Sequence, residues 1–231
     1  RYNVCCICNI MLTSEELHLL AKNPLFNGIR LEELPEALSC LSAEKRSFPK
    51  GSLIFAEGDP AETAFFVLKG NVDLVRYTLT GESQLLESFG QAEVFGEAYA
   101  IKEKAVYGLN AYAKEDSDIL YLHLDELYSR ESCGFGVLLL KNLAIALADK
   151  TLLLKQKLTI VTQKGLEAKV LEYLDCYSSK SGEAFFIPHT REEMAEYLGC
   201  ERSALSRLLS EMAKKGLITY HRNRFVLNPK K

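Results

Sequence analysis

The stretch from 188 to 227 constrains this chain most, because it holds two short helical patterns separated by a tight turn. Thr190 is followed three residues later by Glu193, the spacing of a capping box at a helix start. Gly199 stands where that helix would end, since glycine readily adopts the backbone conformation that terminates helices. A second helical pattern begins at Arg202. Two short helices across such a turn predict a helix-turn-helix.

The second helix of this motif has two chemically different sides. Its apolar side consists of Leu205, Leu208, Leu209 and Met212, at helical spacing. The opposite side is a polar strip of Arg202, Ser203, Ser206, Arg207 and Ser210. Arginine can donate two hydrogen bonds to a guanine edge in the major groove of DNA. We therefore expect four residues to read bases: Arg202, Ser203, Ser206 and Arg207.

A hairpin pattern over 217–227 follows the two helices and predicts a winged helix. Cationic and hydroxyl side chains at helix starts and on such a wing are suited to DNA phosphates. We expect four residues to make phosphate contacts: Thr190, Arg191, Arg222 and Arg224. The pattern thus points to double-stranded DNA as a partner.

Composition and charge fit this interpretation. The 231 residues exceed one average domain, and 48% apolar with 26% charged residues is normal for a folded protein. A membrane span is not expected, because no run of about 18 apolar residues occurs. The net charge of −3 conceals an asymmetry, since residues 164–231 carry 12 Lys and Arg against 9 Asp and Glu. An acidic N-terminal part and a basic C-terminal part suit a sensor joined to a DNA reader.

Seven cysteines are too irregularly spaced for a disulfide framework, and no secretion signal pattern is present. We therefore expect a reducing, cytoplasmic location. Cys5, Cys6 and Cys8 form a cluster for which two interpretations stay open: a redox or metal-binding role, or an ordinary reduced tail. Because the sequence begins at Arg1 rather than Met, we expect its start to be trimmed or incomplete.

The rest of the chain divides into three patterns. Residues 13–41 are helical, and residues 48–121 alternate short strands with turns, which predicts a small antiparallel barrel or sandwich. A long helical pattern over 135–161 has a wide apolar face that must bury more than one side. Packing against its own barrel and against a second copy would do so, and a buried helix in a monomer is the alternative. Polar residues recur at heptad steps on one edge: Asn142, Asp149 and Gln156.

Taken in order, these features resemble the Crp/Fnr family of bacterial transcription regulators. The resemblance rests on the opening at 48–59, the strand 65–70, the Val94-Phe95-Gly96-Glu97 segment, the long helix and the winged helix around 199–207. It implies an α+β fold with an N-terminal antiparallel β-roll of the cyclic-nucleotide-binding type. The expected domains are a sensing β-roll domain with N-terminal helices (1–134), a dimerisation helix (135–163) and a winged helix-turn-helix (164–231). It further implies a homodimer that reads a palindromic operator and acts through RNA polymerase.

Departures from the family pattern limit the effector. Members that bind cyclic AMP carry an Arg-Ser pair after the Gly-Glu, and the equivalent positions here are Tyr107 and Gly108. No Arg lies between Arg76 and Arg130, so a buried cyclic phosphate would lack its counter-charge. Oxygen sensors of the family hold an iron–sulfur cluster, but the barrel position that supplies a cysteine falls near Leu120. We therefore expect an unknown small-molecule effector that is neither cyclic AMP nor such a cluster.

The expected effector pocket combines residues of the barrel with one of the long helix: Phe95, Gly96, Glu97, Tyr107, Gly108, Asn110 and Leu154. For Glu97 a structural carboxylate is an equal alternative, and for Tyr107 a place in the core. Two other functions are alternatives. The first is a redox- or metal-responsive regulator that uses the N-terminal cysteines. The second is a regulatory subunit of an enzyme, which the lack of any nucleophile–base pair, phosphate loop or metal motif disfavours, so an enzyme is not expected.

Overall fold

The computed structural model describes residues 3–4, 10–78, 80–102, 104–129, 134–179 and 182–228. They belong to two compact units, Arg1–Leu147 and Ala148–Lys231, each treated by itself below. The boundary falls inside the long helix α5 (Gly136–Val161). The sequence had instead suggested three parts divided at residues 134 and 163, a division that stays a prediction.

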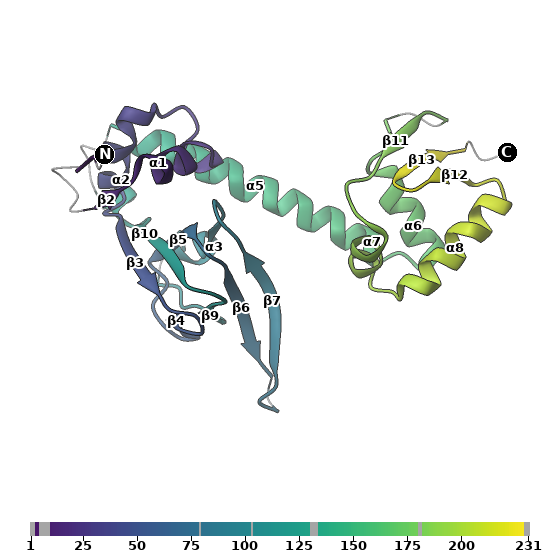
Figure 1. The fold of residues 1–231 in the computed structure, drawn as a ribbon, viewed down its shortest axis with the longest axis horizontal. Coiled ribbons are helices and arrows are strands. Elements are labelled where there is room, and N and C mark those ends of the chain that lie inside the picture. The colour runs from purple at the N-terminus through teal and green to yellow at the C-terminus, as the bar shows by residue number, and fades with distance from the viewer. Residues whose placement is uncertain are drawn as a thin grey trace. The chain divides into compact units, whose positions relative to one another are not determined.

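The first unit opens with short helical elements that pack on a β-roll (Figure 1). These are α1 (Ser14–Ala21), two 3-10 turns at Pro24–Phe26 and Leu31–Glu33, and α2 (Leu34–Cys40). A short pair of strands, β1 (Asn3–Val4) and β2 (Met11–Leu12), precedes them. Thr13 and Glu16 form a reciprocal capping box at the start of α1. The buried side chains of these elements share one core with the N-terminal turns of α5.

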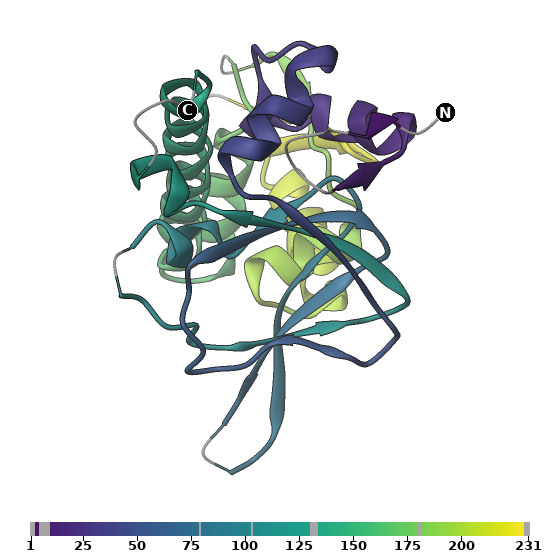
Figure 2. The same ribbon diagram turned by 90° about the vertical axis from the view of Figure 1, so that its left-hand side faces the viewer.

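The roll consists of two four-stranded antiparallel sheets (Figure 2). One sheet has the order β3-β10-β5-β8, formed by Glu44–Phe48, Ser117–His123, Thr63–Lys69 and Val94–Phe95. The other has the order β4-β9-β6-β7, formed by Leu53–Phe55, Asn110–Ala113, Val72–Tyr77 and Ser83–Phe89. Two short helices, α3 (Glu97–Ala100) and α4 (Glu126–Ser129), complete the unit. The antiparallel roll is confirmed.

Residues on the first turns of α5 attach this helix to the N-terminal elements. Leu139 and Leu143 are buried in the shared core. The Asn142 amide is also buried and donates hydrogen bonds to the carbonyl oxygens of Leu25 at 3.0 Å and Asn27 at 2.7 Å. Asn142 therefore satisfies backbone carbonyl groups of a neighbouring turn.

The second unit is a winged helix. It contains α6 (Leu166–Asp175), α7 (Arg191–Leu198), α8 (Arg202–Lys214) and a three-stranded sheet of order β11-β13-β12. The strands are Ala184–Phe186, Arg224–Leu227 and Ile218–His221. Their buried side chains and those of the helices form one core that includes Tyr173, Leu205 and Phe225. The α+β fold and the predicted order of elements are confirmed. No helix within the described ranges is long and apolar enough to cross a membrane.

Candidate nucleic-acid interface

Helices α7 and α8 form the helix-turn-helix. Residues next to each end of α7 determine where this helix begins and ends. The Thr190 hydroxyl accepts a hydrogen bond from the Glu193 amide, while the Glu193 carboxylate accepts one from the Thr190 amide. The hydrogen bond from the Thr190 backbone amide is the main cause of a lowered pKa of the Glu193 carboxyl. Gly199 ends the helix in the left-handed conformation at φ 66°. The predicted capping box is confirmed, and the Thr190 hydroxyl proposed for phosphate is engaged in it.

Helix α8 separates buried from exposed side chains as its sequence pattern predicts. Leu205, Leu209 and Met212 are fully buried against the core of the unit. The predicted base-reading residues are all exposed on the other side: Arg202, Ser203, Ser206 and Arg207. The structure thus brings these four side chains together on one solvent-facing strip of the second helix.

Arg202 is already paired within the protein. Its guanidinium Nε lies 2.8 Å from Oε1 of Glu192 in the first turn of α7, and both side chains are 64% exposed. Sequence reasoning missed Glu192, because the contact depends on how the two helices cross. The sequence shows that Glu192 is an acidic residue at the start of a helix, but it does not show that Glu192 pairs with Arg202 ten residues later.

The wing is the hairpin of β12 and β13. His221 pairs with Arg224, so Arg222 and Asn223 form a two-residue turn between the strands. Arg222 has a φ of 52°, a left-handed conformation that two-residue hairpin turns require. Arg222 and Arg224 are both exposed, as contacts to phosphate would need.

Arg191 differs from the other predicted phosphate residues, because its guanidinium is engaged with the wing. It donates a hydrogen bond to the Arg222 carbonyl at 3.1 Å, and its carbon Cζ lies 5.7 Å and 5.5 Å from the ring centres of Tyr220 and Phe225. A further nitrogen contacts the Met194 sulfur at 3.4 Å. Burial is the main cause of a lowered Arg191 pKa. In this structure Arg191 fastens the wing to α7.

Comparison with known proteins follows this geometry. The cyclic nucleotide-binding domain family matches residues 45–129, and the Crp-like helix-turn-helix domain family matches residues 148–231. The two matches occur in the order that the roll and the winged helix have in the chain. The chain belongs to the Crp/Fnr family. It is a DNA-binding transcription regulator, and not an enzyme.

Characterised Crp/Fnr relatives match over most of the chain. The cyclic AMP receptor protein of Thermus thermophilus is 27% identical over 207 residues, covering 85% of this chain and 88% of that protein. A CRP-like cAMP-activated global transcriptional regulator of Mycobacterium tuberculosis is 24% identical, covering 87% and 90%. The solved structure of a regulatory protein from Silicibacter pomeroyi is 22% identical with a TM-score of 0.50, and it covers 94% of this chain and 95% of that one.

In the first unit of this Crp/Fnr protein, two of the predicted pocket residues, Phe95 and Tyr107, belong to an aromatic cluster inside the roll. The Tyr107 and Phe55 rings stack with centres 3.8 Å apart, and Phe95 stacks between Phe65 at 5.0 Å and Phe89 at 5.2 Å. The buried Tyr107 hydroxyl donates to the Thr63 carbonyl at 2.6 Å, and burial raises its pKa. Aromatic side chains therefore occupy the inside of the roll beside these positions.

The other predicted pocket residues have structural roles or lie elsewhere. Gly96 has a φ of 79°, and a Cβ there would lie 3.0 Å from the Phe65 ring. Asn110 accepts a hydrogen bond from the Glu57 amide at 3.1 Å, Glu97 is buried, and Gly108 lies near the Tyr99 hydroxyl. Leu154 belongs to the second unit and is 69% exposed. The effector pocket stays a prediction.

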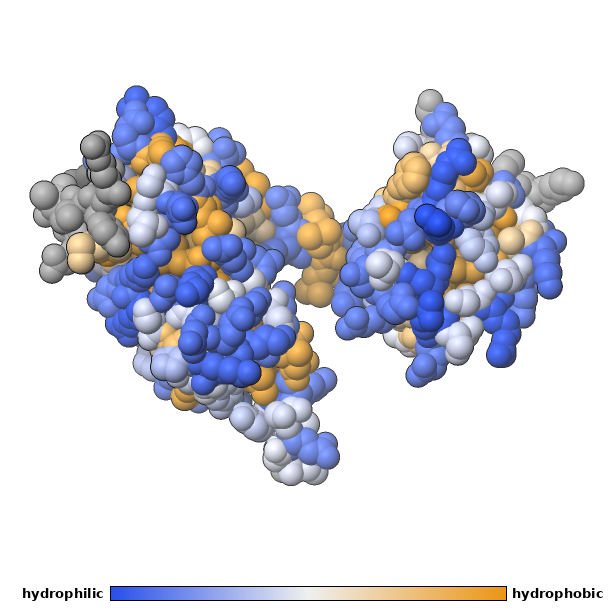
Figure 3. Space-filling view, viewed as in Figure 1, coloured by the Kyte–Doolittle hydropathy of each residue, from blue (hydrophilic) through white to orange (hydrophobic). Residues whose placement is uncertain are grey.

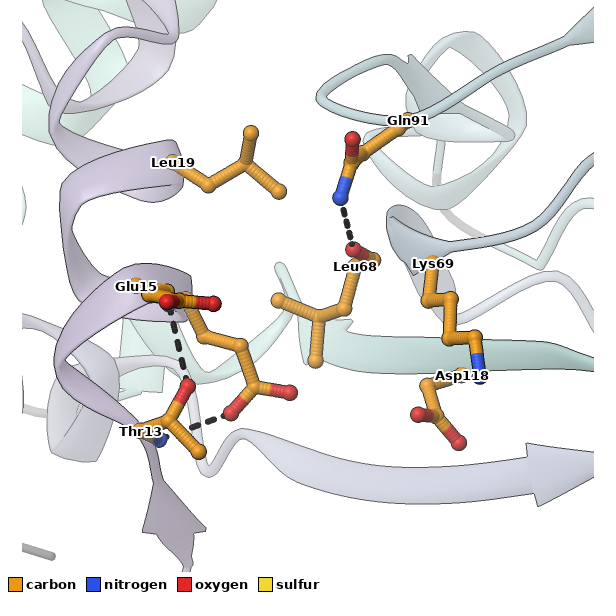
Figure 4. Close-up of a pocket in the computed structure, with 8 residues that line it drawn as sticks. Thr13, Glu15, Leu19, Leu68, Lys69, Gln91 and Asp118 are labelled. Carbon is orange, nitrogen blue, oxygen red and sulfur yellow. Dashed lines mark hydrogen bonds between the residues drawn. The ribbon is translucent and has the colours of Figure 1, made fainter.

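A separate cleft of about 330 Å³ lies between α1 and the outside of the roll (Figure 4). Three of the polar side chains that line it, Glu16, Gln91 and Asp118, already form contacts within the protein. Glu16 pairs with Lys45 at 2.6 Å, Gln91 donates to the Leu68 carbonyl at 2.9 Å, and Asp118 accepts from Ser47. These three side chains therefore have structural roles within the first unit.

The cysteines proposed for a redox or metal role, Cys5, Cys6 and Cys8, lie outside the described residues. Within the part of the chain that is described, no group of three or more His, Cys, Asp or Glu side chains is arranged to hold a metal ion.

Proposed function

We propose that this regulator is a homodimer that reads a palindromic operator, under the control of a small effector other than cyclic AMP bound in the roll. The observation that carries the DNA part is the exposed polar strip on α8, with Arg202 at the first position of the helix and Arg207 near its middle. We infer that these two arginines read guanines. The family relation supports a further step, in which the bound dimer contacts RNA polymerase.

Binding measurements with the full chain test the base-reading role. Because one bidentate contact contributes about 1–3 kcal/mol of discrimination, Arg202→Ala or Arg207→Ala should lower operator preference about 5- to 150-fold. Lys214→Ala removes a cation from the other end of α8 and serves as the control. Equal losses in all three variants would contradict the assignment, because they would indicate a charge effect without base reading.

The side chains inside the roll support an effector other than cyclic AMP. Relatives named for cyclic AMP are similar to this chain along most of its length. However, the two positions where such members carry an Arg-Ser pair hold Tyr107 and Gly108, and Tyr107 is buried and bonded to Thr63. A cyclic phosphate beside these rings would lose its hydration without gaining a guanidinium partner.

Isothermal titration calorimetry tests this exclusion directly. We expect no saturable heat when cyclic AMP is titrated to about 100 times a micromolar Kd. If cyclic AMP did bind with that Kd, the same concentration would stabilise the folded protein against thermal unfolding by about 2.7 kcal/mol. Saturable binding with a rise in Tm would contradict the proposal. A screen of small apolar and aromatic metabolites by the same thermal measurement is the search for the effector itself.

Effector control would work by population shift. A ligand that binds one arrangement of the paired α5 helices more tightly favours that arrangement, and with it one spacing of the two α8 helices. Two-fold related helices must enter major grooves about 34 Å apart to read a palindrome.

A further inference from the structure

Acidic side chains lie among the cations of the surface proposed for DNA. Glu192 is in the first turn of α7, and Glu201 precedes the first residue of α8. Glu192 contacts one of the proposed base-reading residues, since its Oε1 lies 2.8 Å from Nε of Arg202. Glu192 therefore touches the arginine that stands first on α8.

This contact is of little use for stability. Both side chains are 64% exposed, and water and salt screen an ion pair in such a position. Its effect is on orientation, because an arginine side chain is long and has many rotamers when it is free. Holding Nε fixes the plane of the guanidinium and leaves its two terminal amino groups open. Two such donors match the N7 and O6 acceptors of guanine.

The charge of Glu192 acts in the same direction. Phosphates attract arginine mainly through its net positive charge, whereas a guanine edge is neutral and binds through directed hydrogen bonds. A carboxylate at 2.8 Å offsets the positive charge of Arg202 and repels a phosphate that approaches it. It leaves the terminal N–H donors intact.

We infer that Glu192 is a positioning and specificity-determining residue, which holds Arg202 for base edges and disfavours its binding to phosphates. This inference rests on the proposed function, because it presupposes that Arg202 faces DNA. Glu192 thus has a role in DNA recognition although its own charge repels DNA.

Competition between an operator duplex and a scrambled duplex tests the role of Glu192, with full-length protein and an operator obtained by selection from random DNA. Glu192→Gln should bind scrambled DNA more tightly, with a salt slope steeper by about 1, because Arg202 is freed to contact a phosphate. Its preference for the operator should fall by about tenfold. Glu192→Asp keeps the charge but shortens the side chain, so preference should fall without tighter scrambled binding.

Glu196→Gln is the matched control, since it removes one carboxylate from the exposed part of the same helix. Its operator preference should stay within about twofold of the wild-type value, well below the contribution of a base contact. The inference is overturned if Glu192→Gln keeps the wild-type preference or merely matches Glu196→Gln. A wild-type chain that does not distinguish operator from scrambled DNA would instead overturn the proposed function, and this inference with it.

Discussion

Three arginines of the winged helix differ in what surrounds their guanidinium groups. Arg207 is exposed on α8, Arg202 is exposed but held by Glu192, and Arg191 is half-buried between α7 and the wing. An exposed guanidinium is open to DNA, whereas a guanidinium that bonds a backbone carbonyl and lies over two rings maintains the domain. These surroundings distinguish Arg202 and Arg207, which are available for DNA, from Arg191, which stabilises the domain.

Replacing Arg191 tests its architectural role. Arg191→Ala removes the hydrogen bond to the Arg222 carbonyl and the contacts with Tyr220 and Phe225. We expect the free energy of unfolding of the winged helix to fall by about 1–3 kcal/mol. Urea unfolding followed by circular dichroism measures it, with the exposed Arg224→Ala as control at about 0.5 kcal/mol or less. Equal stability of the two variants would show that Arg191 is a surface residue.

Single residues also mark where sequence reasoning ends. Thr190, Glu193 and Gly199 could be placed from sequence, because a cap and its helix involve neighbours within four residues. The contacts of Arg191 with Arg222 and of Asn142 with Leu25 could not, because they join segments 31 and 117 residues apart. The stacking of Tyr107 on Phe55 depends on sheet register in the same way. Helix ends can therefore be predicted from neighbouring residues. Contacts between distant segments decide which polar and aromatic side chains remain available for binding, and the sequence alone does not reveal them.

At the scale of elements, α5 leaves apolar surface exposed. Ile145 and Leu152, at heptad spacing, are 49% and 63% exposed, and Leu154 and Leu158 are 69% and 58% exposed. The space-filling view shows hydrophobic side chains on the exposed part of this helix (Figure 3). Ile145 and Leu152 lie on one side of the helix, and Leu154 and Leu158 lie together on roughly the opposite side. The Leu154 and Leu158 side is exposed apolar surface of the kind that marks an interaction site. Its occupant in our proposal is the same helix of a second copy, since a two-fold interface buries the same face of both partners.

Charged substitutions on α5 test this interface. Leu154→Lys combined with Leu158→Lys places four like charges at a two-fold interface, so we expect the dimer to dissociate into folded monomers. Sedimentation equilibrium would then report about half the wild-type mass. Leu153→Lys is the control, because Leu153 is 63% exposed but points to the other side of the helix. A dimer that survives the double substitution, or dissociates equally in the control, would contradict the proposed interface.

At the scale of the whole molecule, the chain combines a roll of the cyclic nucleotide-binding domain family with a Crp-like winged helix. The winged helix presents Arg202, Ser203 and Arg207 on the exposed side of α8. The roll keeps its antiparallel sheets, but Tyr107, stacked on Phe55, stands at one of the two positions where an Arg-Ser pair is expected of a cyclic-AMP-binding member. In our proposal, this protein therefore reads DNA through α8 and responds to an effector other than cyclic AMP.

The central claim is that a dimer of this chain reads a two-fold symmetric DNA sequence through α8. Selection from a random duplex library with the full chain, followed by sequencing, tests it most directly. We predict enrichment of a palindrome whose half-sites are centred about one helical turn apart, 10–10.5 base pairs. We also predict that guanine positions in each half-site lose their enrichment in the Arg202→Ala and Arg207→Ala variants. Absence of any enriched sequence, or enrichment of a site without two-fold symmetry, would contradict the account.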